Sequence, residues 1–295
     1  MDFEILTHSR IKARKNCPMH EHIRYDLQLV PKNKREALNI GSAVHLGLET
    51  SDIDQAVAYF DGAMPSTQEE ADKLEINRSM VRAMLQGYFA KFGQWPDDSM
   101  KEQKFDIPIV NPETGAQSRT FRLNGKIDAI VKLDNQYWIV EYKTAGQINE
   151  GYLERLELDD QISTYIYAAQ KMFGINVAGV IYRVIKKPSI RPTKKESIAQ
   201  YCQRLEQDYQ ERPDFYFYEG QFYRSQEDLE QFEKELWAFT KEYLYQRSKN
   251  IHYKNASRCL DWGKCEYMPI CTGQADWELF YEKKEIHEEL KGDAQ

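Results

Sequence analysis

Residues 121–143 read FRLNGKIDAIVKLDNQYWIVEYK, and this segment carries the clearest strand pattern in the chain. On both sides of the pair Asp134-Asn135 the residues alternate in polarity, which is typical of half-buried strands. An Asp-Asn pair between two such runs favours a two-residue hairpin turn. A turn centred on these two residues would place Asp128 directly across from Glu141 in an antiparallel pair. The sequence therefore predicts a hairpin with two acids facing each other.

The predicted hairpin also carries an amine beside the two acids. The odd-numbered positions of residues 121–133 are apolar except for a glycine, so they are expected to form one face and to leave Asp128 on the other. Glu141 and Lys143 are two residues apart and share a face. Like charges opposite each other destabilise a sheet, and a divalent cation would compensate them. Lys143 could place a water or stabilise charge on a phosphoryl oxygen. The alternatives are a solvated face with incidental charges, and a one-residue bulge that breaks the pairing.

The segments around the hairpin predict a mixed α/β protein. Helical spacing of apolar residues is expected over residues 38–92 with a break near Pro65, over 158–173 and over 225–247. Alternation predicts two more strands, at residues 104–110 and 177–184, the first of which joins the hairpin in a meander. A short hairpin is expected at residues 215–223. The last twenty residues are expected to form a charged, frayed helix.

Length and composition limit the protein class. A chain of 295 residues can form one elaborated domain, and we expect a single unit with a helical region at 1–100, an α/β core at 101–190 and a helical region at 191–295. No apolar run reaches the roughly 18–20 residues that cross a bilayer. The first residues do not resemble a secretory signal, so we expect a cytoplasmic protein without a membrane partner. The formal charge of −7 argues mildly against a nonspecific nucleic-acid coat, although local charge can differ from the total.

Four of the five cysteines are candidate metal ligands. Cys259, Cys265 and Cys271 are spaced six residues apart in a stretch containing glycine and proline, and Cys17 lies far upstream. Five cysteines are too few for a disulfide scaffold in a chain of this length. Cytoplasmic thiols more often bind metals or catalyse reactions than form disulfides. Four thiolates suit Zn²⁺ or an iron–sulfur cluster equally well, and their spacing does not decide between them. Cys202 is left over as a core or surface thiol.

The hairpin sequence resembles a known nuclease signature. LNGKIDAIV followed by WIVEYKT is similar to the G-x-x-D … (D/E)-x-K pattern of the RecB-like branch of the PD-(D/E)xK nucleases. The upstream GSAVH, which ends at His45, resembles the G-x-x-x-H helix of that family. QISTY, from Gln161 to Tyr165, resembles its Q-x-x-x-Y motif. Glu102 resembles an acidic residue that precedes the first core strand in that family, and this is the weakest of the correspondences. The resemblance implies a restriction-endonuclease-like core, in which helices flank a mixed β-sheet.

The same resemblance implies roles for these residues. Asp128 and Glu141 would bind Mg²⁺ or Mn²⁺ together with His45 and the backbone carbonyl of Tyr142. Lys143 would help to generate or place the attacking water for phosphodiester hydrolysis. Gln161 and Tyr165, four residues apart on one helix face, would touch the substrate backbone or the lysine.

One early and three late cysteines around such a core are similar to the iron–sulfur nucleases of CRISPR adaptation and of bacterial end-resection complexes. The resemblance implies a 4Fe-4S cluster on Cys17, Cys259, Cys265 and Cys271, with zinc as the alternative, although the close C-x-x-C pair common in those families is missing here. It implies a DNA exonuclease, rather than an endonuclease, that acts on single strands or ends in recombination, repair or adaptation, with protein partners in such a complex. Two other functions stay open: a non-catalytic DNA-binding or assembly subunit, and an iron–sulfur redox protein.

Overall fold

The computed structural model describes residues 3–32, 36–261, 263–287 and 290. Its strands are β1 (Glu4–Leu6), β2 (Leu29–Pro31), β3 (Met100–Val110), β4 (Gln117–Leu133), β5 (Gln136–Ala145), β6 (Val177–Lys186), β7 (Phe217–Phe222) and β8 (Tyr281–Lys283). Its α-helices are α1 (His8–Asn16), α2 (Pro18–Glu21), α3 (Glu36–Thr50), α4 (Ile53–Ala58), α5 (Gln68–Phe92), α6 (Glu150–Glu157), α7 (Asp160–Phe173), α8 (Ile198–Glu211), α9 (Pro213–Tyr216), α10 (Gln226–Ser248) and α11 (Met268–Cys271). Three short helices of other types are η1 (His22–Asp26), η2 (Ala256–Arg258) and η3 (Trp277–Phe280).

Strand β4 organises a mixed sheet in which β1, β3 and β5 all pair with it. The β3–β4, β4–β5 and β6–β7 pairs are antiparallel, whereas the β1–β4 and β5–β6 pairs are parallel. The predicted meander β3-β4-β5 is therefore confirmed. Helices α6 and α7 form the crossover from β5 to the parallel strand β6, as such pairs require. The prediction of a mixed sheet flanked by helices is also confirmed.

The register of the β4–β5 hairpin is the predicted one. Ala129 pairs with Val140, and the ladder continues to Leu133 and Gln136. The turn residues Asp134 and Asn135 have φ values of 49° and 64°, as a two-residue type I′ turn requires. Asparagine and aspartate tolerate this left-handed region better than other side chains, so the Asp-Asn pair fixes the register locally.

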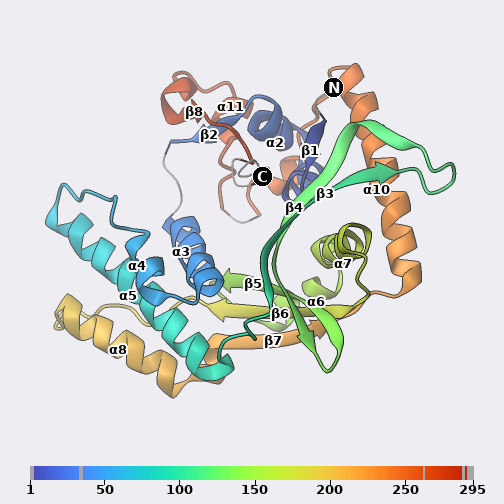
Figure 1. Cartoon of the computed structure of the whole chain (residues 1–295). Helices are drawn as coiled ribbons and strands as arrows, with labels where there is room; N and C mark the ends of the chain where they lie inside the picture. Colours follow the sequence, from blue (N-terminus) through green and yellow to red (C-terminus); the bar gives the residue numbers. More distant parts are fainter. Residues whose placement is uncertain (1–2, 33–35, 262, 288–289, 291–295) are drawn as a thin grey trace.

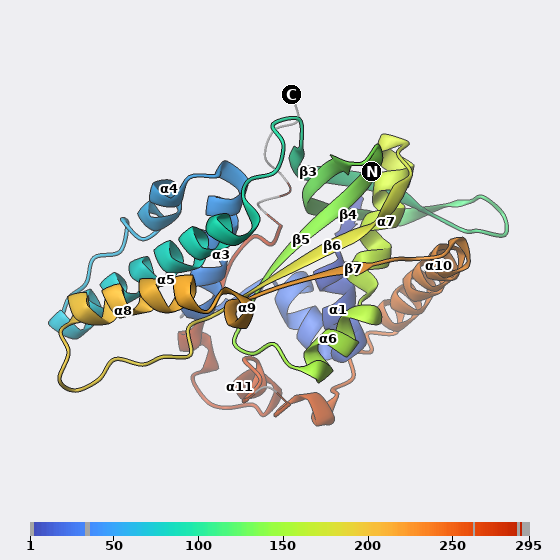
Figure 2. The same ribbon diagram turned by 90° about the horizontal axis from the view of Figure 1, so that it is seen from below.

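Helices cover both faces of the sheet and enclose two apolar cores (Figures 1 and 2). Helices α7 and α10 lie over one face, where the buried cluster includes Phe121, Ile166 and Leu236. Helices α3, α5 and α8 lie over the other face, where Val44 and Met84 belong to the second cluster. Among the described residues, no helix combines the length and the apolar run needed to cross a membrane.

The prediction that β4 has one continuous apolar face is wrong. Phe121, Leu123 and Ile127 pack into the core beneath α7 and α10, but Ala129 and Val131 pack into the core beneath α3 and α5. The change of face coincides with an interruption of the neighbouring ladder, where Glu102 of β3 has a φ of 52° and no partner between its paired neighbours. Local distortions of this kind turn a strand and redirect its side chains. Asp128 lies between the two halves of the strand.

Two peripheral predictions are also corrected. Residues 217–222 form the single strand β7, which pairs with β6 after the short helix α9, so the hairpin expected at 215–223 does not exist. The expected C-terminal helix is wrong for residues 277–283, which form η3 and β8. β8 pairs with β2, which lies near the other end of the chain, and this tertiary pairing outweighs the helical pattern of the local sequence. Residues 288–289 and 291–295 lie outside the described residues. The predicted break near Pro65 is confirmed between α4 and α5.

A buried ionic group ties the first helices to α10. The carboxylate of Glu21 is fully buried and accepts bonds from Arg10 and Arg14, each at 2.8 Å. Tyr243 of α10 donates its hydroxyl proton to the same carboxylate at 2.6 Å. Figure 1 shows α10 running along the outer side of α7, so this group anchors the N-terminal helices beside the sheet.

Candidate functional site

The structure brings the two predicted acids to neighbouring strands. Asp128 lies on β4, and its Oδ2 accepts a hydrogen bond of 2.8 Å from the backbone N–H of Tyr142 on β5. Its Oδ1 lies 3.5 Å from Nδ1 of His45, which α3 presents from the other layer. Asp128, His45 and the backbone of Tyr142 therefore meet, although they come from three elements.

Glu141 is the most enclosed member of the group, with 2% of its surface exposed. Its Oε1 contacts Lys143 and accepts a bond of 2.8 Å from the side-chain amide of Gln161. Its Oε2 is buried and has no hydrogen-bond partner among the described residues. An unpaired buried carboxylate oxygen is costly, and a cation would remove that cost. The donor set of two carboxylates and one imidazole fits a divalent ion.

Gln161 and Tyr165 lie together on α7, as their spacing predicts. The amide of Gln161 donates to the Tyr165 hydroxyl at 2.8 Å as well as to Glu141. Gln161 thus orients the carboxylate, and Lys143 contacts the same carboxylate oxygen. The side chain of Tyr142 points elsewhere, because its hydroxyl accepts a bond from Trp95.

The two carboxyl groups differ in acidity. Burial raises the pKa of Glu141 to about 7; Lys143 opposes this shift and Asp128 adds to it. Burial also works to raise the pKa of Asp128, but His45, Lys143 and the Tyr142 N–H outweigh it and lower that pKa below its ordinary value. Near neutral pH, Asp128 is therefore ionised while Glu141 readily exchanges its proton.

We expect metal binding at this site to depend on pH. An incoming ion must displace the proton of Glu141, whose pKa is about 7. The affinity for Mn²⁺ should therefore fall by up to about tenfold per unit as the pH drops below 7, and level off above it. Free Mn²⁺ can be followed by electron paramagnetic resonance from about pH 5.5 to 8. Glu141→Gln should weaken binding and remove this dependence, whereas an equal affinity across the range in the unchanged protein would contradict the assignment.

Open space adjoins the carboxylates on two sides. A cavity of about 530 Å³ is lined by His45, Glu102, Lys126 and Asp128 among others. A larger cavity of about 1220 Å³ reaches Lys143 and Gln161 and is bordered by Lys12, Lys15 and Arg155. Glu102, the weakest correspondence in the sequence, lies beside the site and forms an ion pair with Lys126.

Three side chains of α1 border the second cavity. His8 lies 3.4 Å from Asp159, beside the second cavity, and Lys12 and Lys15 follow it on the helix. They are more than a hundred residues from the hairpin in the chain. Lys12 and Lys15 belong to the base-rich residues 10–35, which the sequence leaves open as a phosphate-contacting surface or a solvated face, whereas His8 gave no such signal.

The four predicted cysteine ligands gather at the junction of the two chain ends. Asn255 donates its backbone N–H to Sγ of Cys17 at 3.4 Å, and the backbone N–H of Cys265 donates to the carbonyl of Cys259. Burial raises the pKa of Cys265 and of Cys271, and the charges of the neighbouring cysteine thiolates raise both further. Cys202 lies apart and packs against the core beneath α5 and α8.

A family model described as "PD-(D/E)XK nuclease superfamily" matches residues 5–272. No curated protein matches the chain. A solved structure titled "Crystal structure of SSO0001" matches with 14% sequence identity and a TM-score of 0.23, and the match covers 68% of this chain and 84% of that chain. A likeness at that level supports no conclusion about function.

Proposed function

The chain belongs to the PD-(D/E)XK nuclease superfamily, and from that premise we propose that it hydrolyses DNA with Mg²⁺ or Mn²⁺ at Asp128 and Glu141. The family match supports a nuclease, and the local geometry supports the choice of residues. The observation that carries the proposal is the buried Oε2 of Glu141, which no described residue partners, beside an ionised Asp128. A purely structural carboxylate would have its hydrogen bonds satisfied.

Each side chain has a role that its contacts support. Asp128, Glu141, His45 and the Tyr142 carbonyl would hold the ion, which when bound polarises the phosphate and makes a water acidic enough to attack at neutral pH. Lys143 would stabilise charge on the phosphoryl oxygen. Gln161 would keep Glu141 in position, and the neighbouring hydroxyl of Tyr165 holds Gln161 in turn.

The finer assignment is exonucleolytic action on single strands or DNA ends. It is supported by the three motif correspondences to the RecB-like branch at GSAVH, at the hairpin and at QISTY. The exposed ring of Tyr59 lines a further cavity of about 750 Å³ that also reaches Gln161, and an aromatic ring in that position can stack on an unpaired base. The protein would then work in recombination, repair or CRISPR-type adaptation, together with the other subunits of such a complex.

The test is cleavage of DNA labelled separately at each end, as single and double strands, with Mn²⁺ or with a chelator. We expect progressive shortening from an end of single-stranded DNA, with Mn²⁺ only. Internal fragments would replace the exonuclease assignment with an endonuclease. No cleavage of any DNA would favour the non-catalytic binding or assembly subunit.

We also propose that Cys17, Cys259, Cys265 and Cys271 hold a 4Fe-4S cluster that makes residues 1–295 one nuclease domain. The thiols of Cys265 and Cys271 lie close enough to Cys17 and Cys259 for their charges to act on one another. The pattern of one early and three late cysteines around the nuclease core is what supports iron and sulfur over zinc.

Loss of this cluster should destabilise the protein. Cys265→Ser should remove the iron and its brown absorbance and lower the free energy of unfolding by ~2–5 kcal/mol, by analogy with cross-links that close long loops. The measurements are iron content and chemical denaturation under anaerobic conditions. Cys202→Ser is the matched control, because that thiol lies apart from the other four. Stoichiometric zinc without iron would select the alternative metal.

A further inference from the structure

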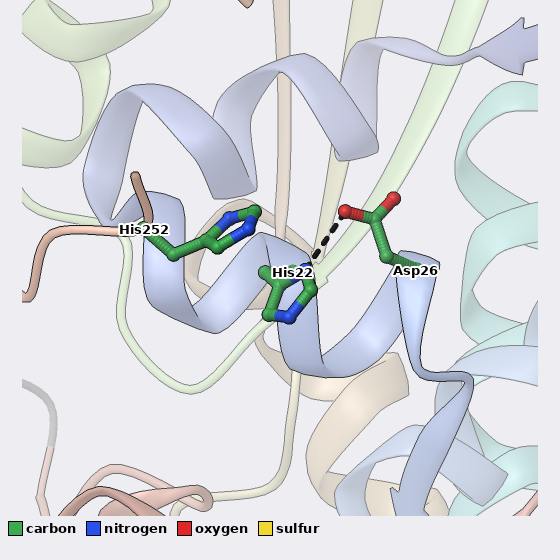
Figure 3. A group of neighbouring side chains, drawn as sticks. All are labelled: His22, Asp26 and His252. Atoms are coloured by element: carbon green, nitrogen blue, oxygen red, sulfur yellow. Dashed lines mark hydrogen bonds and ion pairs between the residues drawn. The ribbon is translucent and has the colours of Figure 1, made fainter. Parts of the chain in front are cut away.

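A second group of metal-ligand side chains lies outside the carboxylate site. His22 and Asp26 from η1 and His252 from the segment after α10 each offer one ligand atom, and these atoms lie within 4.8 Å of one another (Figure 3). His22 and His252 are 230 residues apart in the chain, so the fold itself assembles the group. Two imidazoles and one carboxylate are a donor set typical of divalent first-row transition ions.

The nitrogen atoms of this group are available to a metal. Nδ1 of His252 is buried without a hydrogen-bond partner among the described residues, so its burial is uncompensated. A neutral imidazole carries a lone pair on one of its ring nitrogens, so an unpartnered Nδ1 can coordinate an ion.

Arg10 already orients the carboxylate of Asp26 through the oxygen that does not face His22. Arg10 donates to Oδ1 of Asp26 at 2.8 Å, whereas Oδ2 lies 2.9 Å from Nδ1 of His22. A second contact that fixes a ligand in this way is common around metal sites. Figure 3 shows Oδ2 turned toward the His22 ring. The three residues also border a cavity of about 560 Å³, which leaves room for water on the ion.

The ring arrangement sets one condition. The imidazoles of His22 and His252 are stacked, with centroids 3.6 Å apart and planes 19° from parallel. Stacked rings direct their lone pairs in parallel, so one ring must turn before both can reach a common ion. His252 lies between α10 and η2, outside any helix or strand, and borders the cavity of about 560 Å³ into which its ring can turn.

We propose that His22, Asp26 and His252 form a binding site for one divalent transition ion of the Zn²⁺ or Co²⁺ type. The ion joins η1 to the segment that leads into the cysteine region. It therefore fastens the two ends of the chain at a second point, independently of the thiolates. The site shares no ligand with the carboxylate group, so it does not rest on the proposed nuclease function.

The probe is Co²⁺, titrated into the full-length protein with its cysteine cofactor retained. We compare the unchanged chain with His252→Gln and with the control His20→Gln, whose histidine pairs with Glu266 outside the group. The unchanged chain and the control should bind one more Co²⁺ per chain than His252→Gln. The affinity of His252→Gln for the ion at this site should be at least about tenfold lower than that of the unchanged chain. Loss of even an outer partner of a metal ligand lowers metal affinity by about that factor. Zn²⁺ should raise the melting temperature of the unchanged chain and of His20→Gln by more than that of His252→Gln.

Several outcomes separate the possibilities. The difference spectrum between the unchanged chain and His252→Gln should lack sulfur-to-cobalt charge transfer; its presence would place the ion on the cysteines and overturn the proposal. Equal binding by all three proteins would also overturn it and leave a stacked histidine pair with an ordinary hydrogen bond to Asp26. If His252→Gln does not fold, as judged by circular dichroism, His22→Gln replaces it. Lys143→Ala should keep this ion, whatever happens to cleavage.

Discussion

Lys143→Ala should reduce DNA cleavage by about 10²–10³-fold, the loss typical of removing one group that stabilises developing charge. Among the described residues, Lys143 is the only Lys or Arg whose side chain contacts Glu141. Without it, the pKa of Glu141 should rise further above 7, because the lysine charge now opposes that rise. Rates measured on labelled DNA at several pH values and Mn²⁺ concentrations check this.

Those conditions distinguish two roles of the lysine. If Lys143 only keeps Glu141 ionised, higher pH and more Mn²⁺ should restore the rate of the variant. If it acts on the phosphate, the loss should persist at saturating metal, which is the result we expect. Lys132→Ala is the matched control, since that lysine is exposed on the adjacent strand β4. Full activity of Lys143→Ala would remove the lysine from the mechanism.

Glu21→Gln should lower the free energy of unfolding by ~3–5 kcal/mol, the range for breaking a buried ion pair by removing one partner. Glu21 is fully buried between Arg10 and Arg14, which are themselves almost completely enclosed. The substitution keeps the shape of the side chain but leaves two buried guanidinium groups with less compensation. The link from α1 to Tyr243 of α10 should loosen as well. The melting temperature should drop on the order of 10 °C.

Thermal and urea denaturation measure this change, and Glu235→Gln is the control. Glu235 is exposed on α10 and accepts a single bond from Gln231. A loss below ~1 kcal/mol in Glu21→Gln would mean that water reaches the ionic group and replaces the carboxylate.

Much of the site could be predicted because it depends on local rules. The period of two along residues 121–143 and the left-handed Asp134-Asn135 turn fix the register from Ala129 to Val140 without help from distant residues. The spacing of Gln161 and Tyr165 similarly places both on one face of α7. The β7 strand was less predictable, because its pairing depends on the free edge of β6 rather than on its own pattern.

By itself, therefore, the sequence determined the hairpin, the helix faces and the residue types that can bind metals. Only the packing of the layers shows that β4 changes cores beside Asp128, that Oε2 of Glu141 is buried without a partner among the described side chains, and that His252 stacks on His22. Backbone propensity and side-chain period act over a few residues, so they can be read locally. Burial and the meeting of distant side chains depend on how whole layers pack, and no local pattern records that.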